Sequence, residues 1–166
     1  MWIIIGIIIF ILCIIFNLFL ITFDKKLKKL EKQIILLFEK RTHLVPSLYE
    51  ITKKYLNKHE EVFQEIIHLR KIEFSNYNDS FLQRVKNETL IHHELNFIFK
   101  VANQHPKIQK DEKFLLIRDL FLDNSYEIGK KVEMYKKVIT LLNKLIIFKN
   151  FTVIGIFVGV EKRTEI

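Results

Sequence analysis

The chain has 166 residues, of which 49% are hydrophobic and 28% charged, and these proportions exclude both a disordered tail and a polytopic membrane protein. Its 4 Gly and 2 Pro are too few for the turns of an all-β sandwich, and its single Cys excludes an intramolecular disulfide framework. The net charge of +8 is spread along the chain without an Arg-rich patch interleaved with aromatics, so we expect an all-α protein that binds no nucleic acid.

The first predicted element is a membrane-spanning helix over residues 2–23. This run contains no charged side chain, and at about 1.5 Å per residue it matches the roughly 30 Å core of a bilayer. A cleaved signal peptide is the alternative, but no Lys or Arg precedes the run and no small-residue cleavage site follows it. Cys13 follows Leu12 rather than a small residue, so we interpret it as lipid-facing and not lipid-modified. Residues 1–23 are therefore expected to be an uncleaved anchor.

The charges that flank the anchor predict its orientation. Four lysines follow the run and no basic residue precedes it, so the positive-inside rule places the N-terminus outside the cell and the following domain in the cytoplasm. The same side chains can contact anionic lipid headgroups, at about 1 kcal/mol each. These lysines are Lys25, Lys26, Lys28 and Lys29.

Residues 24–150 are expected to form a helical bundle. Apolar residues recur at spacings of three and four after the anchor, which predicts that the anchor continues directly into the first bundle helix. Pro46 lacks an N–H donor and predicts a kink or a new helix start, after which the helix is expected to run to about residue 69. Arg41 occupies one position of the stripe, and we expect a buried ion pair with Glu60 as the candidate partner. The apolar members are Leu27, Leu30, Ile34, Leu37, Leu44, Leu48, Ile51 and Tyr55.

Turn-like segments at 74–80 and 104–106 separate the remaining predicted helices. One helix is expected over about 81–103. Its expected inward positions are Leu82, Val85, Ile91, Leu95, Ile98 and Phe99. The last helix has the most regular pattern, with steps of four and three that suit an antiparallel bundle of long helices. Its expected inward positions are Phe121, Ser125, Ile128, Val132, Tyr135, Ile139, Leu142 and Ile146.

Residues 151–166 are the third predicted segment, an apolar stretch followed by charged residues. Residues 151–160 are uncharged and β-branched, and they are too short to span a membrane as a helix. Two interpretations remain open. The stretch either folds onto the open end of the bundle or forms a sticky surface for a partner or the membrane.

Candidate catalytic chemistry is sparse. Glu65 and His68 have the i, i+3 spacing of di-iron bundle sites, but those sites need a second such pair, which the sequence lacks. Residues 92–94 (His-His-Glu) are interpreted as solvated surface. No Gly-rich phosphate loop occurs, and the only thiol lies in the expected anchor. We therefore expect no catalytic, cofactor-binding or metal-binding residues, and no enzyme.

The segment 40–48 (KRTHLVPSL) resembles the signature of the LemA family, in which two basic residues precede a D-L-I-P-N-L-V-like run. Residues 55–60 resemble that family's Y-x-x-H-E motif with one extra residue, and 105–108 resemble its Y-P-x-L segment. Four positions depart from the pattern, since His43, Ser47, His105 and Lys136 replace the usual Asp, Asn, Tyr and Asn. The matching positions are Arg41, Leu44, Pro46, Tyr55, His59, Glu60, Arg70, Pro106, Phe114, Tyr135 and Asn143.

The resemblance covers residues 23–160 and implies a bundle of long antiparallel helices, with coiled-coil character, tethered to a bacterial cytoplasmic membrane. It implies no reaction. One relative belongs to the proteins that form magnetosome membranes, which suggests membrane organisation or protein assembly. We expect a single-pass scaffold or adaptor whose partner is an unknown protein or a second copy of the chain. The alternatives are a metal-dependent or hydrolytic helical-bundle enzyme and a module that binds anionic lipid.

Overall fold

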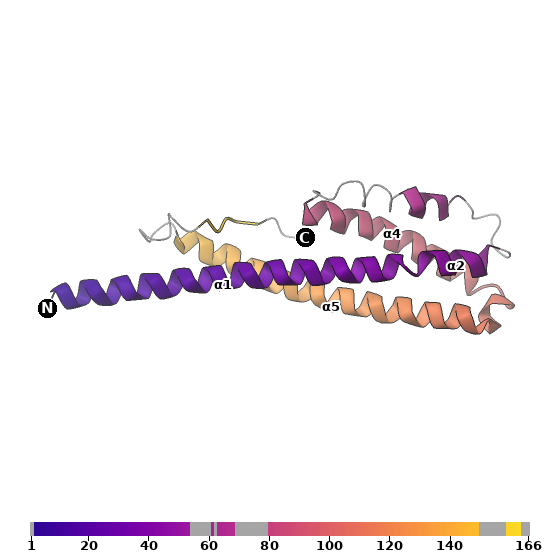
Figure 1. Cartoon of the computed structure of the whole chain (residues 1–166), viewed down its shortest axis with the longest axis horizontal. Coiled ribbons are helices and arrows are strands. Elements are labelled where there is room, and N and C mark those ends of the chain that lie inside the picture. The colour runs from indigo at the N-terminus through magenta and orange to yellow at the C-terminus, as the bar shows by residue number, and fades with distance from the viewer. Residues whose placement is uncertain (1, 54–60, 62, 69–79, 150–158, 164–166) are drawn as a thin grey trace. The chain divides into compact units, whose positions relative to one another are not determined.

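The computed structural model describes residues 2–53, 61, 63–68, 80–149 and 159–163, and within these ranges the chain forms helices and turns without a strand (Figure 1). The predicted all-α fold is confirmed. The elements are α1 (Trp2–Thr42), α2 (Val45–Thr52), α4 (Phe81–Ala102), the short 3₁₀ helix η2 (Ile108–Lys110) and α5 (Glu112–Lys149). Residues 63–68 are also helical.

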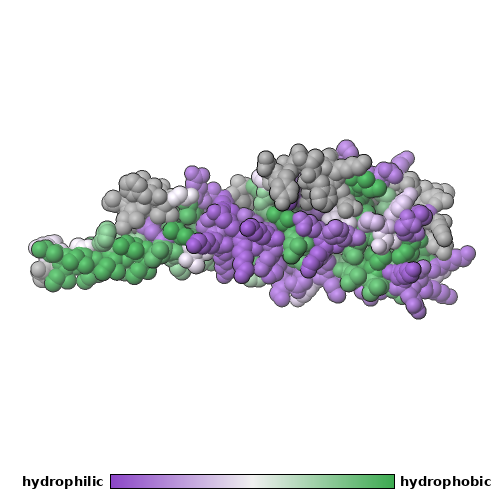
Figure 2. Space-filling model, in the orientation of Figure 1, coloured by the Kyte–Doolittle hydropathy of each residue, from purple (hydrophilic) through white to green (hydrophobic). Residues whose placement is uncertain are grey.

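α1 is a single helix of 41 residues, so the apolar N-terminal run continues without a break into the first bundle helix, as predicted. Its apolar side chains are exposed from Trp2 to Ile15, whereas Leu20 and Leu27 are fully buried. Figure 2 shows the hydrophobic surface over the start of this helix. Within the described ranges, α1 is the helix that is long and apolar enough to cross a membrane.

The predicted break near Pro46 is confirmed as a new helix start. α1 ends at Thr42, and α2 begins at Val45 with Pro46 in its first turn. A proline costs no hydrogen bond there, because the first N–H groups of a helix have no intrahelical partner. The expected unbroken continuation to residue 69 is wrong at its start, since α2 ends at Thr52, although residues 63–68 are helical as expected. No Gly or Pro marks this end, so the sequence gives no local signal for it.

Side-chain caps set the starts of the two later helices. The Ser80 Oγ accepts a hydrogen bond from the Gln83 N–H at 3.4 Å. The Asp111 Oδ1 accepts from the N–H groups of Lys113 and Phe114, at 2.9 and 3.0 Å. Each cap satisfies backbone donors that the first turn leaves free. These boundaries agree with the predicted helix start at 81 and the break at 104–106. The expected turn at 74–79 lies outside the described residues.

The chain divides into two compact units. Unit 1 comprises Met1–Gln33 and Lys131–Ile166, and unit 2 comprises Ile34–Lys130. α1 and α5 contribute residues to both.

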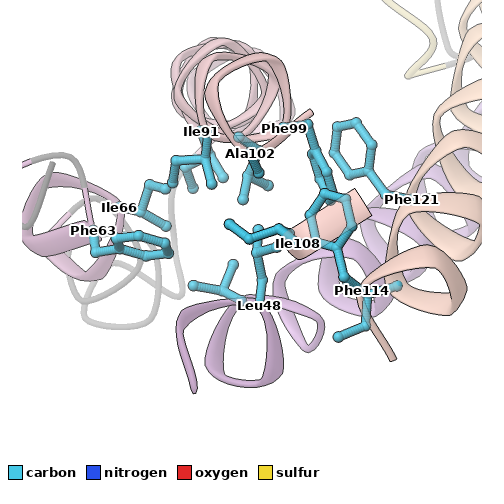
Figure 3. Packing of buried hydrophobic residues seen from close by; sticks show 13 residues of the cluster. Leu48, Phe63, Ile66, Ile91, Phe99, Ala102, Ile108, Phe114 and Phe121 are labelled. Carbon is cyan, nitrogen blue, oxygen red and sulfur yellow. The ribbon is translucent and has the colours of Figure 1, made fainter. Parts of the chain in front are cut away.

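Unit 2 contains an apolar core drawn from α2, residues 63–68, α4, η2 and the first half of α5 (Figure 3). Phe99 lies between Phe114 and Phe121, with ring centroids 5.9 and 4.7 Å away. Burying one side chain of this size stabilises the fold by about 1.5–3 kcal/mol. The core residues are Val45, Leu48, Phe63, Ile66, Ile91, Leu95, Ile98, Phe99, Ala102, Ile108, Phe114, Ile117 and Phe121.

The inward stripe of α4 is confirmed at Ile91, Leu95, Ile98 and Phe99, which are buried. At the start of the helix Leu82 and Val85 are only partly buried, and Asn87 and Glu88, which were not expected to face inward, are buried. The buried stripe of α4 passes through Ile91, and a step of three or four residues toward the N-terminus reaches these polar positions rather than the apolar ones. Glu88 occupies its buried position as an ion-pair partner.

In unit 1, α1 and α5 run antiparallel. The Lys131 Nζ donates to the Gln33 Oε1 at 3.0 Å, and the Tyr135 hydroxyl donates to the Glu31 Oε1 at 3.2 Å. The predicted inward stripe of α5 is confirmed in both units, with its remaining members Ser125 and Val132 partly buried. The buried members are Phe121, Ile128, Tyr135, Ile139, Leu142 and Ile146.

Candidate functional site

Arg41, in the last turn of α1, is 3% exposed and forms a buried ion pair in unit 2. Its Nη2 donates to the Glu88 Oε2 at 2.5 Å and to the Glu88 carbonyl oxygen at 3.0 Å. The guanidinium carbon also lies 5.6 Å from the centre of the Phe38 ring. A buried charge needs a partner because desolvation is costly. The partner found is Glu88 on α4, whereas the expected partner Glu60 lies outside the described residues.

His92 belongs to the same network, so its interpretation as solvated surface is wrong. Its ring stacks on Phe121 with centroids 5.5 Å apart, and its Nδ1 lies 3.0 Å from the Arg41 Nη1. Arginine only donates, so Nδ1 accepts from Arg41, and the Asn96 side-chain amide lies 2.9 Å from Nε2. Burial, followed by the charges of Arg41 and His93, lowers the pKa of His92 below 6.5. The imidazole is therefore neutral near pH 7. His93 is exposed, as expected.

The network of Arg41, Glu88 and His92 joins α1 to α4 through polar contacts. Arg41 stays protonated near neutral pH, and the Glu88 carboxylate balances its charge. Glu65 and His68 are both exposed on the helix of residues 63–68. Among the described residues, no group of three or more His, Cys, Asp or Glu side chains could hold a metal ion.

A second polar cluster, the C-terminal clamp, lies in unit 1 and consists of Asp24, Glu31, Tyr135, Asn143 and Arg163. The Arg163 guanidinium donates to Glu31 at 2.6 Å and to Asp24 at 2.7 Å. Burial and the charge of Glu31 raise the pKa of Tyr135 to about 12, so its hydroxyl remains a donor to that carboxylate.

Asn143 completes the clamp by binding the backbone of the C-terminal segment. Its Nδ2 donates to the Arg163 carbonyl at 2.8 Å, and its Oδ1 accepts from the Arg163 N–H at 3.1 Å. One side-chain amide therefore satisfies both polar groups of that residue. Tyr135 and Asn143, both predicted as motif positions, meet at the same C-terminal residue.

An open apolar groove with a volume of about 540 Å³ lies in unit 2, between α2 and the start of α5. Two motif positions, Leu44 and Pro46, line it. Leu116 and Leu120 on α5 are 61% and 46% exposed along it. Ile51 and Ile117 complete its apolar lining. This shape suits an apolar ligand surface, because it offers contact area with few polar groups.

The remaining predicted positions are dispersed. Phe114 is fully buried in the core of unit 2, and Pro106 lies in the turn before η2. Lys25, Lys26 and Lys29 are exposed, and Lys28 pairs with Asp24 at 2.9 Å. The motif positions outside the described residues are Tyr55, His59, Glu60 and Arg70.

Sequence reasoning missed four residues of these clusters, namely Asp24, Glu31, Glu88 and Arg163. Glu88 had a usable signal, because it lies four residues before His92 and continues the buried stripe of α4. No sequence signal pointed to Arg163, because it lies outside any segment with helical periodicity.

Comparison with known protein families gives one match. The family model of the LemA family matches residues 30–164, which includes Arg41, the groove and most of the C-terminal clamp. A search of curated proteins found no match.

We predict that Arg41→Leu lowers the free energy of unfolding by about 3–5 kcal/mol, because it leaves the buried Glu88 carboxylate without its cation. Denaturant unfolding of the full chain in detergent, followed by circular dichroism, measures this change. The control Lys137→Leu breaks an exposed pair with Glu133 and should leave stability almost unchanged. Equal stabilities of the two variants would contradict the role of the network.

We predict that folding stability falls as the pH drops below about 6.5, because the folded state disfavours protonation of His92 while the unfolded chain accepts the proton freely. Above that pH both states hold a neutral ring and the effect vanishes. Unfolding measured between about pH 7 and pH 5 should therefore be less pH-dependent in His92→Gln than in the natural chain. His68→Gln, at an exposed position outside the network, is the control and should keep the natural slope. Identical slopes in all three proteins would rule out His92 as the titrating group.

Proposed function

Because the family match covers most of the chain, this protein belongs to the LemA family, and we propose that it is a single-pass membrane scaffold that holds a protein partner at the cytoplasmic face. The observation that carries the proposal is the continuity of α1. The helix has an uncharged, exposed apolar surface from Trp2 to Ile15 and a bundle-packed surface from Leu20 onward. Such a surface is stable in lipid, where a helix satisfies all its own backbone groups.

The charges next to the anchor support a cytoplasmic position for the rest of the chain. Lys25, Lys26 and Lys29 are exposed directly after the apolar stretch. Basic residues of short flanking segments are retained on the cytoplasmic side. The same exposed side chains can reach anionic headgroups.

The apolar groove supports the adaptor role. Its lining is aliphatic, and Glu50 and Lys113 give it one charge of each sign. Grooves of this kind accept the apolar face of an amphipathic helix, which inserts side chains spaced three and four residues apart. We therefore propose that the partner presents such a helix. A second copy of the chain and a different protein are the two outcomes that an experiment can separate.

A protease-accessibility measurement tests the orientation. An epitope tag placed after Ile166 should resist protease in intact spheroplasts and be lost after the membrane is permeabilised. Replacing Lys25, Lys26, Lys28 and Lys29 with Gln removes the orienting charges and should produce a mixed population. Digestion of the natural chain in intact spheroplasts would place the domain outside the cell and contradict the proposal.

Site-specific photo-cross-linking tests the adaptor role. A photo-reactive residue at Leu116, inside the groove, should give a discrete adduct in membranes, whereas the same residue at Leu122, which is 55% exposed outside the groove, should not. Leu120→Asp should abolish the Leu116 adduct, because it places a charge in the apolar groove. The adduct mass distinguishes a second copy from another protein. Equal labelling at both positions, or an adduct that survives Leu120→Asp, would argue against the groove as the binding site.

A further inference from the structure

We propose that the last two turns of α5 enter the same membrane leaflet as the end of the anchor, so that the protein contacts lipid acyl chains through two elements. This inference rests on the proposed membrane anchoring of α1. It concerns residues of unit 1 only.

The antiparallel register of α1 and α5 carries the first step. Lys131 lies opposite Gln33, and Tyr135 lies opposite Glu31. Both helices rise about 1.5 Å per residue, and they run in opposite directions. Each step of one residue toward the C-terminus of α5 therefore lies opposite a step of about one residue toward the N-terminus of α1. Ile146 therefore falls opposite the turn of α1 that ends at Leu20.

Burial inside the apolar run gives the second step. A lone membrane helix exposes its whole surface to lipid, yet Leu20 is fully buried and Asn17 is 3% exposed. Asn17 precedes Phe23 by six residues, which places it about 9 Å inside the expected membrane span. Its Nδ2 donates to the Cys13 carbonyl at 2.7 Å. Another part of unit 1 therefore covers this amide, and a polar side chain in a membrane is stable when protein covers it in this way.

The exposed side chains of α5 give the third step. They change from charged to apolar near the part of α5 that lies opposite the end of the anchor. Glu133 and Lys137 form an exposed ion pair, whereas Leu141 and Ile147 are apolar and 50% and 51% exposed. Lys144 is the exposed charge between them, and its long stem can carry the ammonium back to the headgroups. An exposed apolar surface beside a membrane helix fits the acyl chains of the adjoining leaflet.

Lipid quenching tests the inference in the full chain. Cys13→Ser removes the only natural thiol, and Ile147→Cys then carries a small fluorophore in liposomes whose phosphatidylcholine is brominated along the acyl chain. The control Lys137→Cys lies earlier on the same helix, and Ile8→Cys marks the anchor. We expect the probes at residues 147 and 8 to lose comparable fractions of their fluorescence to bromine, and the probe at 137 to lose almost none.

The outcomes separate this inference from the proposed function. Quenching at residue 8 without quenching at 147 would overturn the inference and leave the anchor intact. No quenching at residue 8 would overturn both. Equal quenching at 147 and 137 would show that no boundary lies between them and would also overturn the inference. Lys144→Cys provides a second exposed position within the last two turns, where the same result is expected if Ile147→Cys does not fold.

Discussion

The hydrogen bonds of α1 run without interruption for 41 residues, and this continuity constrains everything that packs on the helix. In the proposed membrane-anchored state, this one helix meets two solvents. Apart from Asn17 and Thr22, the side chains of its first half are uncharged and apolar, as lipid favours, whereas Leu27, Leu30 and Ile34 repeat at steps of three and four, as packing in a bundle favours. The two demands meet near Asn17 and Leu20, where the surface is already buried by protein.

The buried pair of Arg41 and Glu88 fixes how α1 meets α4. Apolar residues of similar volume at these two positions would give a fold of similar stability. The charges therefore act by selecting one arrangement of α1 against α4. A shift of either helix by one residue would rotate the charge on that helix by about 100° away from its partner and leave both charges desolvated and unpaired. His92 adds a proton-dependent element to the same contact. Its neutral ring accepts from Arg41, and a protonated ring would place two cations 3.0 Å apart.

The sequence predicted the features that depend on local periodicity. The continuous first helix, the break at Pro46 and the inward stripe of α5 all follow from spacing and from the missing proline N–H. The features that depend on distant contacts were not predictable. Glu88 lies 47 residues from Arg41, and a periodic pattern identifies a buried position without identifying its partner.

The same limit applies to the C-terminal clamp. Arg163 follows a segment with no helical period, and its two carboxylate partners lie at the other end of the chain. The apolar groove shows an intermediate case. Leu44 and Pro46 were recognised as motif positions, but their exposure beside α5 depends on tertiary packing.

The hydrogen bonds between Asn143 and Arg163 have a consequence for how α1 and α5 can come apart in unit 1. Arg163 donates to Glu31 and Asp24 on α1, and Asn143 on α5 holds its backbone through two hydrogen bonds. This one residue therefore bridges both helices of unit 1. Separating α1 from α5 there must break either the two ion pairs to α1 or the two hydrogen bonds to α5, in addition to the direct contacts of Lys131 and Tyr135.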